Sequence, residues 1–234
     1  MGSADKTEPR ARVLRRVLTK GASSSAILVL GLAAAACTHK PFESQTLHYA
    51  TFKVPQPTGN VVHVCHAYGC QKKTRVRFDA ATLAEIKSLM DKTRRADTPA
   101  EERRAVAYAI GWIERYVGMK IGTSADRAGM DFAGSGDPTQ QDCVDEATNT
   151  TSYLNVIASN GFLRHHTVGV PFAKENYLNG IAGWTHWTAV LHETSTGETW
   201  AVDSWIYANG ENPAIVEASQ WYISDLDSLP ASTR

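Results

Sequence analysis

Cys143 is the residue that points most directly to chemistry in this sequence. It follows Asp142 and precedes an apolar stretch, 144–158, which has the length of a helix and ends at Asn160-Gly161, a common helix stop. A thiol in the first helical turn lies near the positive end of the helix dipole, which favours the thiolate. Because the thiolate attacks carbonyl carbon, we interpret Cys143 as a candidate nucleophile.

A predicted β-hairpin, 184–203, supplies a base and an acid. Its two arms have strand composition and flank a polar turn. Side chains alternate along a strand, so Asp203 shares a face with His186 if Leu191 pairs with Trp200, or if that register shifts by two residues. A shift by one residue would separate them. We therefore expect an imidazole–carboxylate pair.

The predicted roles follow from the residue types. His186 would take the Cys143 proton, or hold it as a thiolate–imidazolium pair, and Asp203 would orient the imidazole and stabilise its charge. Backbone N–H groups at the helix start would stabilise an oxyanion. The side chain of Gln140 or Gln141 is a further candidate donor, and the sequence does not choose between the two.

The order and spacing of these residues resemble the transglutaminase-like superfamily of papain-type cysteine enzymes. Residues 143–147 and 186–190 are similar to the Cys-x-Asp-x-Ala helix start and the His-x-x-x-Val/Leu strand of the bacterial transglutaminase-like cysteine peptidases. The resemblance covers roughly 106–206. It implies an α+β fold of the papain/transglutaminase type, in which the nucleophile helix packs on an antiparallel β-sheet.

The resemblance also bears on metal binding. Some members of the bacterial family bind calcium through acidic residues that flank the nucleophile, and Asp142 and Asp145 match two such positions. Val144 stands where another acidic residue would be. We therefore expect no cofactor, with calcium at these two residues as the alternative. In the simpler interpretation, Asp142 is a helix cap, and Asp145 and Glu146 are favourable charges in a first turn.

The first 37 residues have the composition of an export signal. Basic residues precede an apolar segment, 26–36, which is too short to span a bilayer and ends in three alanines before Cys37. This resembles a bacterial lipoprotein signal, in which the cysteine is lipidated. An ordinary cleaved signal peptide is the alternative, and Arg15-Arg16 loosely resembles a twin-arginine signal. We expect a periplasmic protein that is anchored to the outer membrane through a lipid on Cys37.

The remaining chain is predicted to form a tether and one domain. Residues 38–60 are polar and contain three prolines, as in a tether, and 61–234 would form the hydrolase domain. Near the start of this domain, strand-like segments flank Cys65 and Cys70. In an exported protein these cysteines are expected to form a disulfide across a hairpin loop. Two nearby histidines make a metal site the alternative, although the usual paired zinc spacing is missing.

Two helices are predicted before Cys143. Asp79 is a candidate N-cap of the first, and the second begins at Thr98-Pro99, followed by Glu101 as in a capping box. An apolar stripe of the second helix is expected to face the core: Val106, Ala109, Ile110, Ile113 and Val117. The Gly-rich residues 121–141 are predicted to form a long loop, and 213–222 a short helix.

The expected function is hydrolysis of a peptide or isopeptide bond in the cell envelope through a thioester intermediate. With 24 basic and 24 acidic residues, the chain gives no electrostatic reason to expect nucleic acid as a partner. The alternatives are acyl transfer, as in transglutaminases, and a non-catalytic lipoprotein that uses the same fold to bind a partner. The lack of an HExxH pair disfavours a metal-dependent hydrolase. His165-His166 is a rival base without an evident acid partner.

Overall fold

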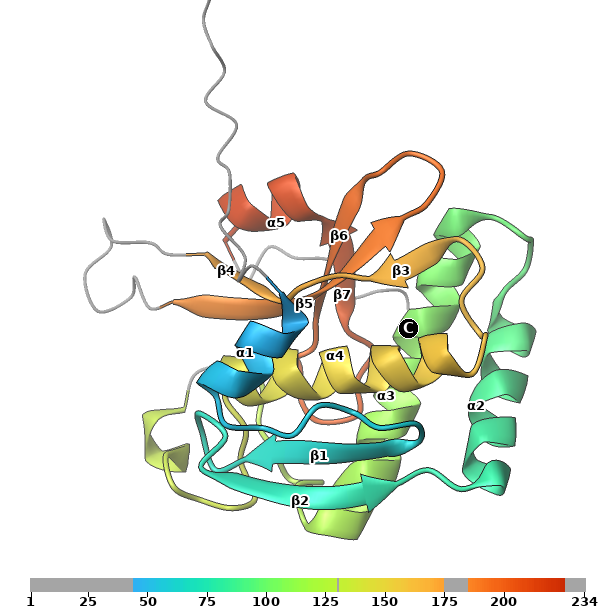
Figure 1. The fold of residues 1–234 in the computed structure, drawn as a ribbon. Helices are drawn as coiled ribbons and strands as arrows, with labels where there is room; N and C mark the ends of the chain where they lie inside the picture. The colour runs from blue at the N-terminus through green and yellow to red at the C-terminus, as the bar shows by residue number, and fades with distance from the viewer. Residues whose placement is uncertain (1–43, 130, 175–184, 226–234) are drawn as a thin grey trace, which may run out of the picture. The chain divides into compact units, whose positions relative to one another are not determined.

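The computed structural model describes residues 44–129, 131–174 and 185–225, which all belong to one unit, 37–234. The predicted signal peptide and its Cys37 lie outside the described residues. Helices and strands are mixed, as the α+β prediction requires. Helix α4, Cys143–Ser159, crosses the middle of the fold between a five-stranded sheet and a two-stranded hairpin (Figure 1). Among the described residues, no helix is both long and apolar enough to cross a membrane.

The sheet is organised around β5, His186–Glu193. Its order is β3–β5–β6–β7, and β4 pairs with β5 off this path. The other strands are β3, His166–Val168, β4, Phe172–Lys174, β6, Thr199–Asp203, and β7, Ala214–Glu217, and every pairing is antiparallel. Leu191 pairs with Trp200, so the first predicted hairpin register is confirmed. Asp203 follows the Ala189–Val202 pair and thereby reaches the face of β5 that carries His186.

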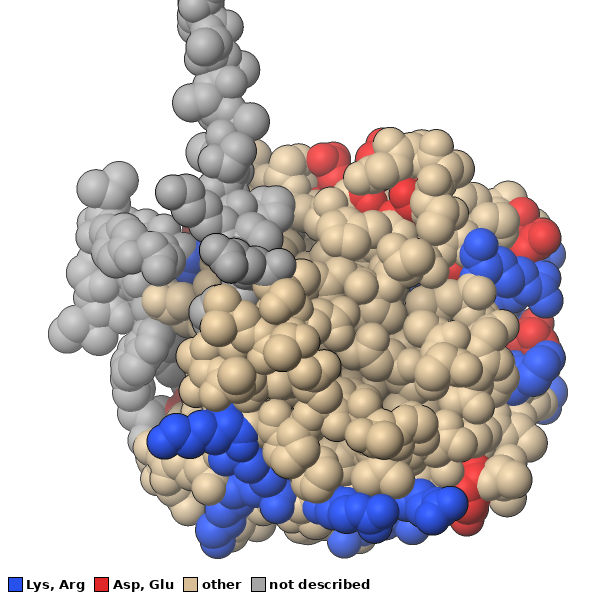
Figure 2. Space-filling model, in the orientation of Figure 1, with Lys and Arg blue, Asp and Glu red and all other residues tan. Residues whose placement is uncertain are grey.

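The hairpin consists of β1, Val61–His66, and β2, Lys72–Arg77. The disulfide predicted between Cys65 and Cys70 is present and closes the loop between the strands. Lys and Arg side chains gather along the β2 side of the molecule (Figure 2). Charged side chains on an edge strand oppose pairing with another chain, so this composition protects an open edge.

Two helices pack against each other and contribute to the core, and both predicted starts are confirmed. Asp79 caps α2, Ala80–Thr93, and Thr98 caps α3, Pro99–Ile121. Helix α3 ends at Gly122, whose φ of 90° lies in the left-handed region that glycine adopts readily. The predicted stripe of α3 is buried: Val106, Ala109, Ile110, Ile113 and Val117. The loop after α3 contains one short 3-10 turn, Phe132–Gly134.

Helix α4 is buried along most of its length, although its middle, 148–152, is polar. Asn149 accepts a hydrogen bond from the N–H of Cys65 at 2.7 Å and donates to the carbonyl of Cys65 at 2.9 Å. Thr151 donates to the carbonyl of Ala147 at 2.7 Å. Buried polar groups stabilise a fold only when they are hydrogen-bonded, and the two bonds of Asn149 attach the nucleophile helix to β1.

The prediction of a tether over 38–60 is wrong for the residues that the structure describes. Helix α1, Gln45–Thr51, begins in this segment, and its His48 and Tyr49 are buried. His48 lies 2.9 Å from the Thr148 hydroxyl, and Tyr49 lies 2.9 Å from the Ser152 hydroxyl, so α1 is bonded to α4. A polar, proline-containing composition does not show which side chains the rest of the fold will bury.

The C-terminal segment also differs from its prediction. Residues 213–222 were expected to be helical, but they form β7 and then the short helix α5, Ala218–Ile223. Strand β7 pairs with β6 and places Ala214 opposite Asp203. With β7, the sheet has five strands among the described residues. Four residues of strand are too few for a periodic pattern to be recognised.

Candidate functional site

Cys143, the candidate nucleophile, is the first residue of α4. Asp142 is the N-cap: its carboxylate accepts the N–H of Asp145 at 2.9 Å, and the Asp145 side chain accepts the N–H of Asp142 at 3.3 Å. The Cys143 side chain is largely buried, with 9% of the residue exposed. Its Sγ donates to the carbonyl of Thr185 at 3.6 Å and accepts from the N–H of Trp187. The thiol therefore contacts the main chain on both sides of the candidate base.

His186 and Asp203 form a buried pair. His186 Nε2 lies 2.6 Å from Asp203 Oδ2, and the side chains are 4% and 1% exposed. A carboxylate only accepts hydrogen bonds, so Nε2 carries the proton and Nδ1 of the neutral imidazole keeps a lone pair. This Nδ1 has no hydrogen-bond partner among the described residues. The imidazole can accept a proton at Nδ1, and the carboxylate would stabilise the resulting cation.

Two indole rings enclose this imidazole. The ring centroids of Trp205 and Trp221 lie 4.7 and 5.3 Å from that of His186. Trp221 Nε1 also donates to Asp203 Oδ2 at 2.7 Å. Trp221 lies on α5, and no motif in the sequence connects it with the site.

Unsatisfied polar atoms gather at the same place. Besides Nδ1 of His186, the described residues offer no partner to Oδ1 of Asp203 or to Nε1 of Trp205. Buried polar atoms in folded proteins are nearly always hydrogen-bonded, so each exception requires an explanation. A reacting or binding site is one such explanation.

The charge environment of the thiol differs from the expectation. Burial raises the pKa of Cys143, and the carboxylates of Asp142, Asp203 and Asp145 raise it further, whereas the N–H of Trp187 lowers it. The prediction that the helix dipole favours a thiolate is therefore wrong for the resting site. Acidic side chains at the helix start offset the positive end of the dipole. The thiol is protonated at rest and needs a base when it reacts.

The two candidate calcium ligands have other partners. Residues 67–70 all have positive φ, between 56° and 70°, so this loop is a left-handed turn closed by the disulfide. The N–H groups of 68–70 donate in order to Asp145 at 2.8 Å, Asp142 at 2.9 Å and Asp145 at 2.6 Å. Successive N–H groups of this kind form an anion-binding nest. Calcium would need oxygens that here accept N–H groups, so the geometry supports the capping interpretation.

Among the described residues, one group has the composition of a metal site. Ligand atoms of Cys65, Cys70 and Asp145 lie within 4.8 Å of one another. The two cysteines form a disulfide, and both oxygens of Asp145 accept N–H groups. Metal ions bind thiolates, which a disulfide does not offer. This group therefore does not fit a metal while the disulfide is intact.

The two candidate oxyanion donors are engaged elsewhere. The amide of Gln140 donates to the carbonyl of Ala125 at 3.1 Å, and its oxygen accepts the N–H of Arg127 at 3.2 Å. The amide of Gln141 donates to Glu146 Oε1 at 2.8 Å. Both glutamines are buried. The structure therefore does not support an oxyanion role for either, because such a donor must be aimed at the reacting carbonyl.

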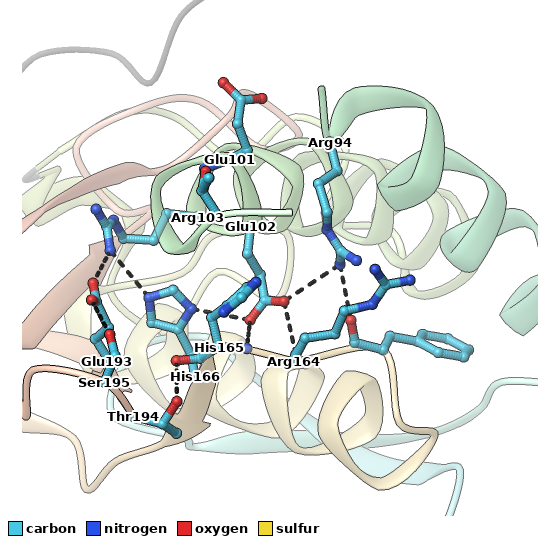
Figure 3. Close-up of polar contacts among 12 residues, drawn as sticks. Arg94, Glu101, Glu102, Arg103, Arg164, His165, His166, Glu193, Thr194 and Ser195 are labelled. Carbon is cyan, nitrogen blue, oxygen red and sulfur yellow. Dashed lines mark hydrogen bonds and ion pairs between the residues drawn. The ribbon is translucent and has the colours of Figure 1, made fainter. Parts of the chain in front are cut away.

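The rival base also differs from its prediction, because His166 does have an acid partner. His166 Nδ1 lies 3.0 Å from Glu102 Oε1, and Nε2 lies 3.2 Å from Arg103 Nη1 (Figure 3). Arginine only donates, so Nδ1 carries the proton and both imidazole nitrogens are satisfied. The sequence did not reveal the acid, which lies 64 positions away on α3. A histidine with both nitrogens occupied has no atom available for a substrate proton.

Comparison with known proteins finds no matching family model, no matching curated protein and no matching solved structure. Function must therefore be inferred from the geometry of the site. The structure brings the start of α4 to β5 and β6, and so gathers the three residues selected from the sequence: Cys143, His186 and Asp203.

Proposed function

We propose that this protein is a thiol hydrolase of the transglutaminase-like type, which cleaves a peptide or isopeptide bond in a protein or peptide of the cell envelope. One observation supports this most strongly. The Nε2 of a buried imidazole, His186, is held by Asp203, and its Nδ1 has no partner among the described residues. The Cys143 thiol contacts the main chain on both sides of this imidazole. General base and nucleophile are recognised by such geometry and not by position in the sequence.

In the proposed reaction Cys143 is the nucleophile, and His186 acts first as a base and then as an acid. Rotation of the Cys143 side chain would turn its S–H from the carbonyl of Thr185 toward Nδ1 of His186, which takes the proton as sulfur attacks the amide carbon. The C–N bond then breaks, the proton on Nδ1 passes to the leaving amine, and a thioester remains. Water attacks the thioester while Nδ1 accepts a proton from it, and the carboxylic acid leaves as the thiol is restored.

Oxyanion stabilisation is assigned to the main chain. The Asp142 carboxylate accepts the N–H groups of Asp145 and Val144. We therefore assign the N–H of Cys143 itself as the oxyanion donor in the first turn of α4. A backbone donor next to the nucleophile stays in place through the reaction, so it requires no reorganisation as charge develops.

The arrangement of elements supports the family assignment within this proposal. A nucleophile on the first turn of a helix, packed against an antiparallel sheet whose neighbouring strands carry the base and the acid, is the papain/transglutaminase arrangement that the sequence resembles. An exported location and a lipid anchor on Cys37 belong to the same proposal. They rest on the signal-like sequence alone.

Alkylation of the full-length protein by iodoacetamide, followed by peptide mapping, tests the site. Cys143 should react in the folded protein, because His186 can take the proton from a thiol that is protonated at rest. His186→Ala should shift this reactivity to higher pH, because the base is lost. If Cys143 is inert until the protein unfolds, the thiol is a packing residue and the hydrolase proposal is wrong.

Product analysis separates hydrolysis from its alternatives. A peptide library incubated with the protein should yield cleaved products, and Cys143→Ala should yield none while remaining folded. If hydroxylamine adducts form at the expense of free acids, acyl transfer is the main reaction. The non-catalytic alternative would be supported if Cys143→Ala retained the phenotype of the wild-type protein.

A further inference from the structure

Glu146 connects the two halves of the candidate site. It lies three residues after the nucleophile on α4 and is 3% exposed. Its Oε1 accepts the amide of Gln141 at 2.8 Å, and its Oε2 accepts the hydroxyl of Ser204 at 3.0 Å. Gln141 belongs to the loop that leads into Cys143, and Ser204 directly follows Asp203. The Glu146 side chain therefore joins the loop that precedes Cys143 to the end of β6, the strand that carries Asp203.

The link extends beyond Glu146. Ser204 Oγ lies 2.9 Å from the hydroxyl of Thr150, one turn further along α4. The N–H of Gln141 donates to Asp126 Oδ1 at 2.6 Å. The end of β6 and the loop before α4 are thus each held at two points.

Acidic groups, and no described cationic partner, surround this carboxyl. Burial raises the pKa of Glu146, and the carboxylates of Glu114, Asp126 and Asp145 raise it further, whereas Ser204 lowers it. Glu114 reaches it from α3, Asp126 from the loop after α3, and Asp145 from the same helix. These effects favour the neutral carboxyl over the carboxylate. A neutral carboxyl offers one donor and one acceptor, which a glutamine amide can reproduce.

We propose that Glu146 is a positioning residue, which sets the separation between the Cys143 thiol and the His186–Asp203 pair by binding Gln141 and Ser204. This inference rests on the proposed function. Glu146 touches no reacting atom and acts only through its two partners. Proton transfer from sulfur to Nδ1 depends steeply on distance and alignment. Loss of both contacts should therefore lower thiol reactivity without removing any triad member.

Two replacements of Glu146 test the proposal in the full-length protein. Glu146→Gln keeps the shape. Its carbonyl can accept from Gln141, and its amide can donate to Ser204 when the serine hydroxyl turns to donate to Thr150. Glu146→Leu keeps a similar volume and loses both contacts. The measurement is the second-order rate constant for alkylation of Cys143 by iodoacetamide, assigned by peptide mapping, over about pH 5 to 9, which brackets ordinary thiol ionisation.

The expected results differ between the two variants. Glu146→Gln should reproduce the wild-type pH profile. Glu146→Leu should lower the rate at neutral pH roughly 10- to 100-fold, and its profile should move toward that of His186→Ala. A residue that only fills space would leave the profile in place, because the ionisation and alignment of the thiol would not change.

Glu102→Leu is the matched control. Glu102 is equally buried, joins α3 to β3 and lies in the His166 network of Figure 3. It should lower stability and leave the alkylation profile of Cys143 unchanged. If Glu146→Leu also leaves the profile unchanged, or if both leucine variants change it alike, Glu146 has no positioning role.

Two further outcomes are also decisive. If Glu146→Leu does not fold, Ser204→Ala removes one contact with little change in volume, and an unchanged profile in that variant overturns the positioning role. If the wild-type profile is itself insensitive to His186→Ala, the proposed hydrolase function fails and this inference fails with it. If the wild-type profile does depend on His186 but Glu146→Leu leaves it unchanged, only the positioning role is overturned.

Discussion

Two buried histidine–carboxylate pairs have their histidines on the neighbouring strands β3 and β5, and they differ in the contact that the second imidazole nitrogen makes. In the pair of His166 and Glu102, both side chains are 0% exposed and Arg103 occupies the other nitrogen. In the pair of His186 and Asp203, the other nitrogen has no partner among the described residues. The first pair is a closed structural network, and the second keeps one proton-accepting atom free.

The surroundings of the two carboxylates also differ. Glu102 accepts the N–H groups of 164 and 165, and Arg94 lies 3.5 Å from it. Burial alone would raise its pKa, but hydrogen bonds from His166 and from these N–H groups lower it overall. Beside Asp203, the acids Glu114 and Glu146 both interact with Ser204, and burial raises the pKa of each. A histidine–carboxylate pair therefore indicates a catalytic role only when the second imidazole nitrogen can still accept a proton.

Replacing one histidine of each pair gives the largest expected contrast. His186→Ala should lower amide hydrolysis on the order of 10⁶-fold, as removal of the base does in triad enzymes. His166→Ala should keep the rate but lower the free energy of unfolding by about 3 kcal/mol, because the Glu102 charge loses a partner. Hydrolysis assays and urea unfolding of both variants provide the measurement. Parallel losses of activity would remove the distinction between the pairs.

Replacing the carboxylates should give the next largest contrast. Asp203→Asn should lower the rate about 10⁴-fold, because an amide can donate to the imidazole and favour the wrong tautomer. Glu102→Gln should instead act on stability. Steady-state kinetics with the two purified variants, checked for folding by circular dichroism, would measure this. An Asp203→Asn variant as active as the wild type would show that the acid has no part in the reaction.

The two environments predict opposite effects of pH on stability. Burial raises the pKa of Glu114 from 4.5 to about 8, so the unfolded chain binds fewer protons than the folded one between these values, and stability falls as pH rises through this window. Glu102 has a lowered pKa, so its contribution is present above about pH 4.5 and is lost as pH falls below it.

Glu114→Gln sharpens this contrast. The variant should flatten the decline of the unfolding free energy between pH 4.5 and 8, the interval between the ordinary and the raised pKa. The change should amount to about 2–4 kcal/mol at the alkaline end. Urea unfolding at several pH values would measure it. A decline as steep as in the wild type would assign the pH dependence to other groups.

Trp221→Phe should have the smallest effect. The indole donates to Asp203 at 2.7 Å and packs against the imidazole, and phenylalanine keeps much of the packing without the donor. The loss should be about tenfold in rate, or 1.4 kcal/mol. The ratio of kcat values for variant and wild type measures it. A comparable loss in Trp200→Phe, which alters the ring beside Arg103 in the other network, would mean that both effects are general destabilisation.

Local signals predicted much of the fold. Thr98, Pro99 and Asp79 start their helices as expected, because capping depends on a few neighbouring residues. Alternation along β5 and β6 predicted that Asp203 shares a face with His186, and the structure selected one of the two registers that allow this. The β7 strand and the burial of α1 were missed, because both depend on partners distant in the sequence.

The candidate site could likewise be predicted only in part from local signals. Cys143, His186 and Asp203 could be selected from residue type, order and strand parity. The contacts of Trp221 and Glu146 could not, because they arise from α5 and from the end of β6 meeting α4.

By itself, the sequence determined the starts of three helices, the shared strand face of His186 and Asp203, the short disulfide loop and the identity of the three candidate residues. These depend on interactions between residues near one another in the chain. The tertiary structure alone decided which histidine nitrogen lacks a partner among the described residues, which acids have raised pKa values and which main-chain groups the thiol contacts. Those properties depend on burial and on charges brought together from distant segments, and desolvation of a group is known only once its neighbours are in place.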